Sequence, residues 1–130
     1  MNEGGSIDWR KLREFADVDL TKSFVLTWHI EAETLFIDVD LFLEADHPFY
    51  EKPRPSEKVC IRPACIEFPF CDALSADQVD GSEVVEIAEK IGHGAIADLA
   101  VLENGQYLIS GEFGTVSINA ERPILRLKGP

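Results

Sequence analysis

Apolar and polar residues alternate along two consecutive segments, residues 23–31 and 34–44. Side chains on a strand point to opposite faces with a period of two, so the pattern predicts two β-strands that each bury one face. The polar bend between them predicts an antiparallel hairpin. A slip of one residue would expose one apolar row, so the register is strongly specified. The expected cross-strand pairs are Ile30 with Leu35, Trp28 with Ile37, Leu26 with Val39, and Phe24 with Leu41.

The opposite face of this hairpin is mixed rather than polar. It places Thr27 opposite Asp38 and His29 opposite Phe36. A face with this apolar content is not expected to be bare in water. We expect an N-terminal helix or a partner chain to cover part of it.

Two segments show helical spacing. Trp9, Leu12 and Ala16 fall on one stripe, which predicts a short helix over residues 7–16 capped by Ser6. A second helix is expected over residues 81–91, because a strand interpretation there breaks at Glu89. Its expected features are an apolar stripe of Val84, Ile87, Ala88 and Ile91, a capping box of Asp80 and Glu83, and a stop at Gly92.

The remaining apolar runs predict further strands. Residues 59–68 change phase at Pro63, which indicates a bulge or an edge position there. Asn104-Gly105 lies between two β-like runs and predicts a hairpin with a two-residue loop. Strands are also expected over residues 115–120 and 124–127. The pairs expected across the Asn-Gly loop are Leu102 with Tyr107, Ala100 with Ile109, and Ile96 with Phe113.

These elements predict one globular domain over residues 1–130, in keeping with its length. The expected fold class is α+β. It combines a strongly bent antiparallel sheet of about five to seven strands, half-barrel or sandwich-like, with the N-terminal helix and the second helix near 81–91.

The formal net charge of −12 is unevenly distributed. Residues 31–57 hold eight acids and two bases, and residues 72–103 hold eight acids and one base. Nucleic-acid binding needs basic side chains that neutralise phosphates, so no nucleic-acid partner is expected. A negative field attracts a basic protein, although acids also serve simply to keep a protein in solution.

Cellular context is indicated by two features. Three cysteines, Cys60, Cys65 and Cys71, are an odd number with wide spacing, which favours buried thiols in a reducing cytoplasm. The acidic N-terminus is unlike a secretion signal, and no apolar run has the length of a membrane span, so no membrane partner is expected. The oligomeric state stays open, a homodimer included.

Candidate binding residues gather in and before a proline-rich crossing, residues 45–57. Asp38 and Asp40 share a strand face about 7 Å apart, a spacing at which two carboxylates share a cation or move protons, although a solvated face explains them as well. His47 lies beside Tyr50 on a backbone stiffened by prolines. We expect no cofactor and no metal. The candidate binding residues are His47, Tyr50, Asp38, Asp40, Arg54 and Glu57.

Three motifs resemble a bacterial domain family to which no activity is attached. They are Ser23-Phe24-Val25-Leu26-Thr27-Trp28, His47-Pro48-x-Tyr50-x-x-Pro53-x-Pro55-x-Glu57, and Gly111-Glu112-Phe113-Gly114-x-Val116. The strand order is also similar, more distantly, to that of β-rich immunity proteins of bacterial toxin systems. The acidic segment 83–90 departs from the family pattern, where a shorter connection is expected.

Together these observations favour a non-enzymatic binding protein. One form of that hypothesis is a toxin-neutralising, immunity-type protein that acts through an acidic surface. The alternative is a small-ligand-binding or regulatory β domain, and a metal-dependent hydrolase is the third class.

Overall fold

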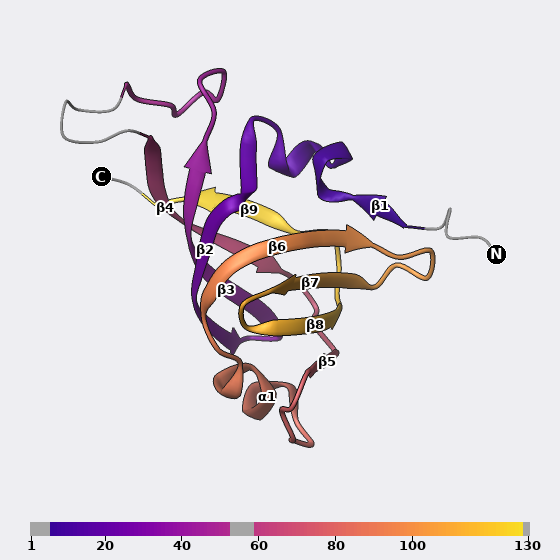
Figure 1. Cartoon of the computed structure of the whole chain (residues 1–130). Coiled ribbons are helices and arrows are strands. Elements are labelled where there is room, and N and C mark those ends of the chain that lie inside the picture. The colour runs from indigo at the N-terminus through magenta and orange to yellow at the C-terminus, as the bar shows by residue number, and fades with distance from the viewer. Residues whose placement is uncertain (1–5, 53–58, 129–130) are drawn as a thin grey trace.

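The computed structural model describes residues 6–52 and 59–128. Within these ranges the chain forms one antiparallel sheet of nine strands, in the order β5-β8-β7-β6-β2-β3-β4-β9, with β1 paired to β6 beside this path (Figure 1). The strands are β1 (Ile7–Asp8), β2 (Val18–Glu31), β3 (Thr34–Leu43), β4 (Cys60–Phe68), β5 (Ala73–Ala76), β6 (Gly94–Val101), β7 (Tyr107–Gly111), β8 (Gly114–Asn119) and β9 (Ile124–Leu127). The helical elements are two 3-10 turns, η2 (Trp9–Lys11) and η3 (Arg13–Phe15), and one α-helix, α1 (Val84–Lys90).

The α+β fold class expected from the sequence is therefore wrong. The described residues form nine strands rather than five to seven, and the helical part is small. Two strands that the sequence did not predict, β1 and β5, are only two and four residues long. Runs this short carry too little alternation to stand out from their surroundings.

The N-terminal helix is also absent from the described residues. Its place is taken by β1, η2 and η3, because Leu12 between the two turns has an extended backbone. Asp8, not Ser6, caps η2 by accepting a hydrogen bond from the amide of Arg10 at 3.0 Å. The buried residues Trp9, Leu12 and Phe15 are spaced three apart, which is the period of a 3-10 helix rather than of an α-helix.

The long strand β2 is interrupted by two register shifts, one between Asp19 and Phe24 and one between Val25 and Thr27. The pairs nearest the turn, Ile30 with Leu35 and Trp28 with Ile37, are confirmed. Beyond them the predicted pairs are wrong. Phe24 lies opposite Asp40 and Val25 opposite Val39, so the second shift reverses which side chains face the core. Val25 is buried, whereas Phe24 and Leu26 are exposed.

The helix predicted over residues 81–91 is confirmed as α1, Val84–Lys90. The stripe is also as expected, because Ile87, Ala88 and Ile91 are buried and Val84 packs against the core. The predicted capping box is wrong. Glu83 is the N-cap residue without a side-chain cap, and the Glu86 carboxylate instead accepts from the amide of Ser82 at 3.2 Å.

The register of the β6–β7 hairpin differs from the prediction. Near the loop the difference is one residue, because Val101, not Leu102, lies opposite Tyr107. Beyond the shift between Ile96 and Asp98 it is two residues, because Ile96 lies opposite Gly111 rather than Phe113. The carbonyl of Leu102 accepts from the amide of Gly105, and the amide of Leu102 donates to the carbonyl of Gln106. Residues 102–106 separate the paired Val101 and Tyr107, so the loop is longer than the predicted two-residue turn, and Gly105 within it has φ +90°.

Strand β4 runs without a register shift through Pro63, which lies opposite Asp40. Of the two predicted alternatives, the bulge is wrong and the edge position fits, because β9 pairs with β4 only from Ala64 to Glu67 and Pro63 lies just beyond that ladder. The apolar pattern changes phase because three consecutive residues, Ala64, Cys65 and Ile66, are all buried. Successive side chains point to opposite faces of the sheet, so both faces of β4 are buried at this point. On the face that carries Cys65, its cross-strand neighbours are Asp38 of β3 and Arg126 of β9.

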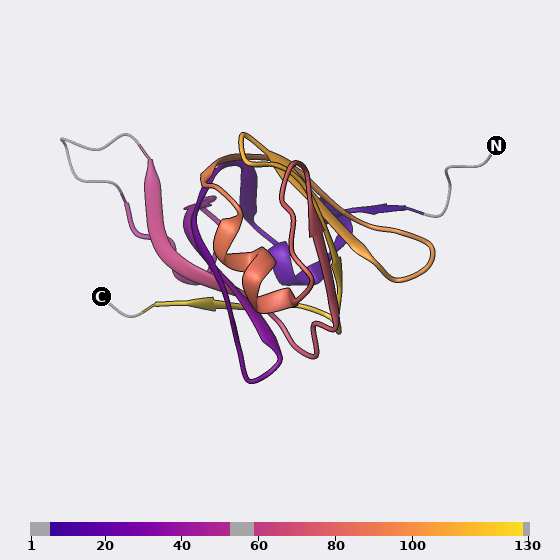
Figure 2. The same cartoon turned by 90° about the horizontal axis from the view of Figure 1, so that it is seen from below.

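The sheet curves around its core, so that strands far apart in its order face each other (Figure 2). Phe68 of β4 meets Tyr107 of β7 edge to face, with ring centroids 5.0 Å apart. The 3-10 turns lie across one end of the curved sheet and α1 across the other (Figure 1). An ion pair between Glu14 and Arg122 ties the first of these ends to the segment that precedes β9.

Candidate functional site

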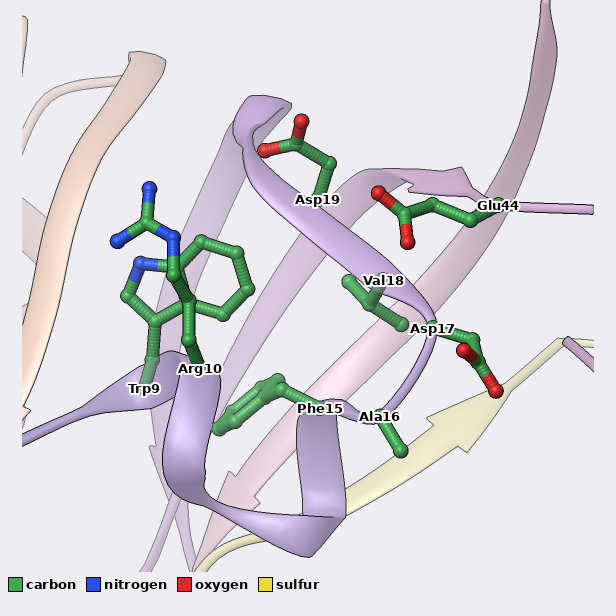
Figure 3. Close-up of a pocket in the computed structure, with 8 residues that line it drawn as sticks. All are labelled: Trp9, Arg10, Phe15, Ala16, Asp17, Val18, Asp19 and Glu44. Carbon is green, nitrogen blue, oxygen red and sulfur yellow. The ribbon is translucent and has the colours of Figure 1, made fainter. Parts of the chain in front are cut away.

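A pocket of ≈ 260 Å³ opens where the 3-10 turns meet the start of β2 and the end of β3 (Figure 3). Its apolar side is made by side chains of the N-terminal segment and by Val18. Its polar side is made by acidic residues. The lining residues are Trp9, Arg10, Phe15, Ala16, Asp17, Val18, Asp19 and Glu44.

The backbone at the mouth of the pocket is shaped by Asp17. This residue has φ +59°, a left-handed conformation that Asp tolerates better than most residues. The chain turns there from η3 into β2. The carbonyl of Asp17 accepts from the amide of Glu44 at 2.9 Å, which brings the end of β3 to the same rim.

The first bulge of β2 fixes Asp19. Its carboxylate accepts from the amide and hydroxyl of Thr21, at 3.0 and 2.6 Å. Ser23 is fully buried, and its hydroxyl bridges the gap that the bulge leaves in the ladder. It donates to the carbonyl of Asp19 at 2.8 Å and accepts from the amide of Phe42 at 2.9 Å. The strand is therefore held firmly in spite of the irregularity.

The charges in the pocket are unbalanced. Asp17 and Glu44 are exposed, and neither carboxylate makes a hydrogen bond or ion pair with a residue that the structure describes. Arg10 is the one basic residue in the lining, and it is already engaged. Its guanidinium lies over the ring of Trp9, 4.4 Å from the centroid, and pairs with Asp8 at 3.1 Å. A negative potential therefore remains at the rim beside an aromatic wall.

Trp9 forms much of that wall and is only 3% exposed. Within the described residues its indole nitrogen is buried without a hydrogen-bond partner. In Figure 3 this nitrogen lies on the side of the ring away from the three carboxylates. The six-membered part of the ring is therefore what Trp9 offers to the pocket.

Two of the predicted site residues follow the pocket residue Glu44 along the chain, and one of them, His47, lies near Asp17. His47 and Tyr50 follow Glu44 in two successive turns, in which the amide of His47 donates to Glu44 and the amide of Tyr50 donates to His47. Burial lowers the pKa of His47, and the nearby Asp17 carboxylate only partly offsets this effect. The Nδ1 atom of His47 accepts from the amide of Phe49 at 3.0 Å, which also requires an unprotonated nitrogen.

The predicted pair Asp38 and Asp40 lies elsewhere, on the outer face of β3. Asp38 is occupied, because it accepts from Thr27 at 2.7 Å and pairs with Lys128 at 2.9 Å. Burial opposes the ionisation of Asp38, but these two hydrogen bonds outweigh it and lower the pKa of its carboxyl. Arg54 and Glu57, the other two predicted residues, lie outside the described residues.

Asp17, Asp19 and the aromatic wall were not predicted from the sequence. Residues 17–22 were expected to form a connection, whereas β2 already begins at Val18. The alternation of buried Val18 and Leu20 with Asp17 and Asp19 was the available signal. The approach of Trp9 and Glu44 to this strand depends on tertiary structure and leaves no local pattern.

Metal and thiol chemistry have little support in the described part of the chain. No three His, Cys, Asp or Glu residues there gather closely enough to hold a metal ion. The three cysteines are buried and unpaired, as expected. Burial raises the pKa of Cys65 and of Cys71 to about 11, so both thiols stay protonated near neutral pH.

Comparison of the chain with protein-family models, with curated proteins and with solved structures found no match in any of the three. The α-helix in the described residues is far too short to cross a bilayer. The chemistry of the pocket is therefore the main guide to function.

Proposed function

We propose that this chain is a non-enzymatic binding protein whose pocket accepts a positively charged side chain of a basic partner. The pocket itself carries the proposal. Carboxylates of Asp17, Asp19 and Glu44 stand on one side of it, and the aromatic ring of Trp9 stands on the other. A guanidinium or ammonium group gains from charge pairing with these carboxylates. It also gains from contact with the ring of Trp9 when the guanidinium of Arg10, which lies over that ring, moves aside.

The size of the pocket favours a single side chain over a metabolite. Sites for small molecules commonly enclose about 300–1,000 Å³. The volume here, ≈ 260 Å³, lies below that range. A free cationic ligand of similar size remains the second candidate, because it would use the same groups.

The overall charge supports a protein partner. With a net charge of −12, the chain attracts basic proteins from a distance, and the rate of association falls as salt screens the field. A toxin-neutralising, immunity-type role is the specific form of this proposal. It draws on the acidic charge and on the resemblance of the sequence motifs.

The proposal is tested by titrating the protein with N-acetyl-arginine amide and with a Gly-Ser peptide that contains one arginine. The readout is the indole NMR resonance of Trp9, with Trp28 as the internal reference because it lies outside the pocket. The double variant Asp17→Asn, Glu44→Gln removes two rim charges. Asp46→Asn is the matched control, since Asp46 is exposed nearby but does not line the pocket.

We expect the Trp9 resonance to shift, and the affinity of the double variant to fall at least tenfold while the control is unchanged. Tighter binding of the peptide than of the amide supports a protein partner, and the reverse order supports a free ligand. An unmoved Trp9 resonance, or equal binding by the double variant, would contradict the proposal.

A further inference from the structure

The outer face of β2, β3 and β4 exposes a group of apolar side chains that no other described element covers. Phe24 is 49% exposed, Leu26 46% and Ile61 41%. Phe42 lies opposite Ile61 in the β3–β4 ladder, and the ammonium of Lys22 lies 5.0 Å from the centroid of its ring. We call these four apolar residues, together with Asp40, the outer patch.

The exposure of this patch results from the second register shift in β2. Regular alternation from Trp28 would turn Leu26 and Phe24 toward the core, as the sequence predicted. The shift between Val25 and Thr27 instead turns Val25 inward, leaving Phe24 opposite Asp40 on the outside. The irregularity thus places two large apolar side chains in water.

Asp40 stands at the centre of the patch. Its neighbours across the ladders are Phe24 on β2 and Pro63 on β4. It makes no hydrogen bond or ion pair with any described residue, whereas Asp38, two residues earlier, pairs with Lys128 and Thr27. Lys128 lies near enough to attract the Asp40 carboxylate and Lys22 lies over the ring of Phe42, but neither ammonium pairs with Asp40. A carboxylate that lacks a paired cation and stands among apolar side chains is complementary to a cation carried on an apolar surface.

We infer that the outer patch is a docking surface for a segment of a partner protein that brings an arginine or lysine to Asp40 and apolar side chains to Phe24, Leu26 and Ile61. A second copy of the chain fits poorly. A symmetric contact would place Asp40 near its own counterpart between two chains that each carry a net charge of −12. This inference rests on the outer patch alone and does not depend on the pocket beside Asp17.

A phage-displayed random peptide library, selected on the full-length protein, provides the probe. Selected peptides are then synthesised and their affinities measured for Asp40→Asn and Phe24→Ser. Two exposed positions on α1 supply matched controls, Glu89→Gln for the charge and Val85→Ser for the apolar side chain.

We expect the enriched peptides to combine a basic residue with aromatic or aliphatic residues. Each outer-patch variant should weaken binding at least tenfold, and each control less than twofold. No enrichment, enrichment of acidic peptides, or equal binding by Asp40→Asn overturns the inference. So does concentration-dependent self-association, measured by sedimentation, that Phe24→Ser abolishes.

The Asp17→Asn variant separates this inference from the proposed function. If it weakens binding of the peptides while Asp40→Asn does not, the peptides occupy the pocket. The outer-patch inference then fails and the proposed function stands. If Asp40→Asn alone weakens binding, the outer patch is the docking surface whatever the pocket binds.

Discussion

The indole nitrogen of Trp28 donates a hydrogen bond of 2.7 Å to the carbonyl of Gly92. This bond ties the centre of β2 to the residue just after the C-cap of α1. The ring of Phe113 packs edge to face against the same indole, with centroids 5.3 Å apart. The first and third motifs of the sequence, which contain Trp28 and Phe113, therefore meet in the folded chain. In these contacts both residues have structural roles.

Replacement of Trp28 separates its two contributions. Trp28→Ala should lower the free energy of unfolding by about 3–5 kcal/mol, as for other large-to-small changes in a core. Trp28→Phe keeps an aromatic ring but loses the hydrogen bond to Gly92. The lost bond should lower the free energy of unfolding by about 1 kcal/mol, in addition to the effect of the smaller ring. The cost is no larger because Gly92 is exposed and water can take the place of the indole. Urea denaturation measures both changes. A fall of less than about 1 kcal/mol for Trp28→Ala would contradict the burial of this side chain.

Ser23→Ala should be costly for a small change. It removes the hydroxyl that bridges Asp19 and Phe42, and it leaves the amide of Phe42 without its partner in the ladder. A buried group that loses its partner costs about 1–3 kcal/mol. Ser75→Ala, at an exposed position on β5, is the matched control and should be close to neutral. If the two variants unfold at the same urea concentration, the bridge does not stabilise the bulge.

The pKa of His47 should lie below the ordinary value of about 6.5 for histidine. The unfolded chain then binds the proton more readily than the folded chain. The contribution of His47 to stability is complete above pH 6.5 and declines as the pH falls from 6.5 to the lowered pKa of the folded state. NMR titration of the imidazole measures this value, and His47→Gln should flatten the pH dependence of unfolding in that window. A measured pKa above 6.5 would show that Asp17 dominates instead.

The ion pair of Asp38 and Lys128 should contribute modestly. Asp38→Asn is expected to cost about 0.2–1 kcal/mol at pH 7, because the pair is partly exposed. The pKa of Asp38 is lowered in the folded state, so its contribution is present above the unfolded pKa and is lost as the pH falls through the folded pKa. The stabilities of the variant and the wild type should therefore converge as the pH falls through the lowered pKa of Asp38. Lys128→Gln provides the second arm of a double-mutant cycle, and strictly additive costs would show that the two side chains do not interact.

The predictions from sequence succeeded where one local pattern decided the structure. Trp28 and Ile37 pair as expected because strict alternation continues from there to the turn. The same pattern failed at Phe24, because the register shift between Val25 and Thr27 breaks the alternation. The prediction of an N-terminal helix was wrong because apolar residues spaced three apart suit a 3-10 turn as well as an α-helix. The extended backbone of Leu12, which divides the segment into two turns, has no signal in that spacing. The pocket could not be predicted, since Trp9, Asp19 and Glu44 approach one another only in the folded chain.

The narrow connection between β2 and β6 has a consequence for how the chain opens. Strands β2, β3 and β4 form one meander of neighbours in sequence, and β6, β7 and β8 form another. The ladder that joins them has only two residue pairs, Phe24 with Ala95 and Val25 with Gly94. The two meanders are therefore joined mainly by side chains of the core they share, such as Phe68 against Tyr107, and only slightly by backbone hydrogen bonds. Native-state hydrogen exchange should show the amides of this short ladder exchanging sooner than those inside either meander, because few neighbouring backbone pairs hold it closed.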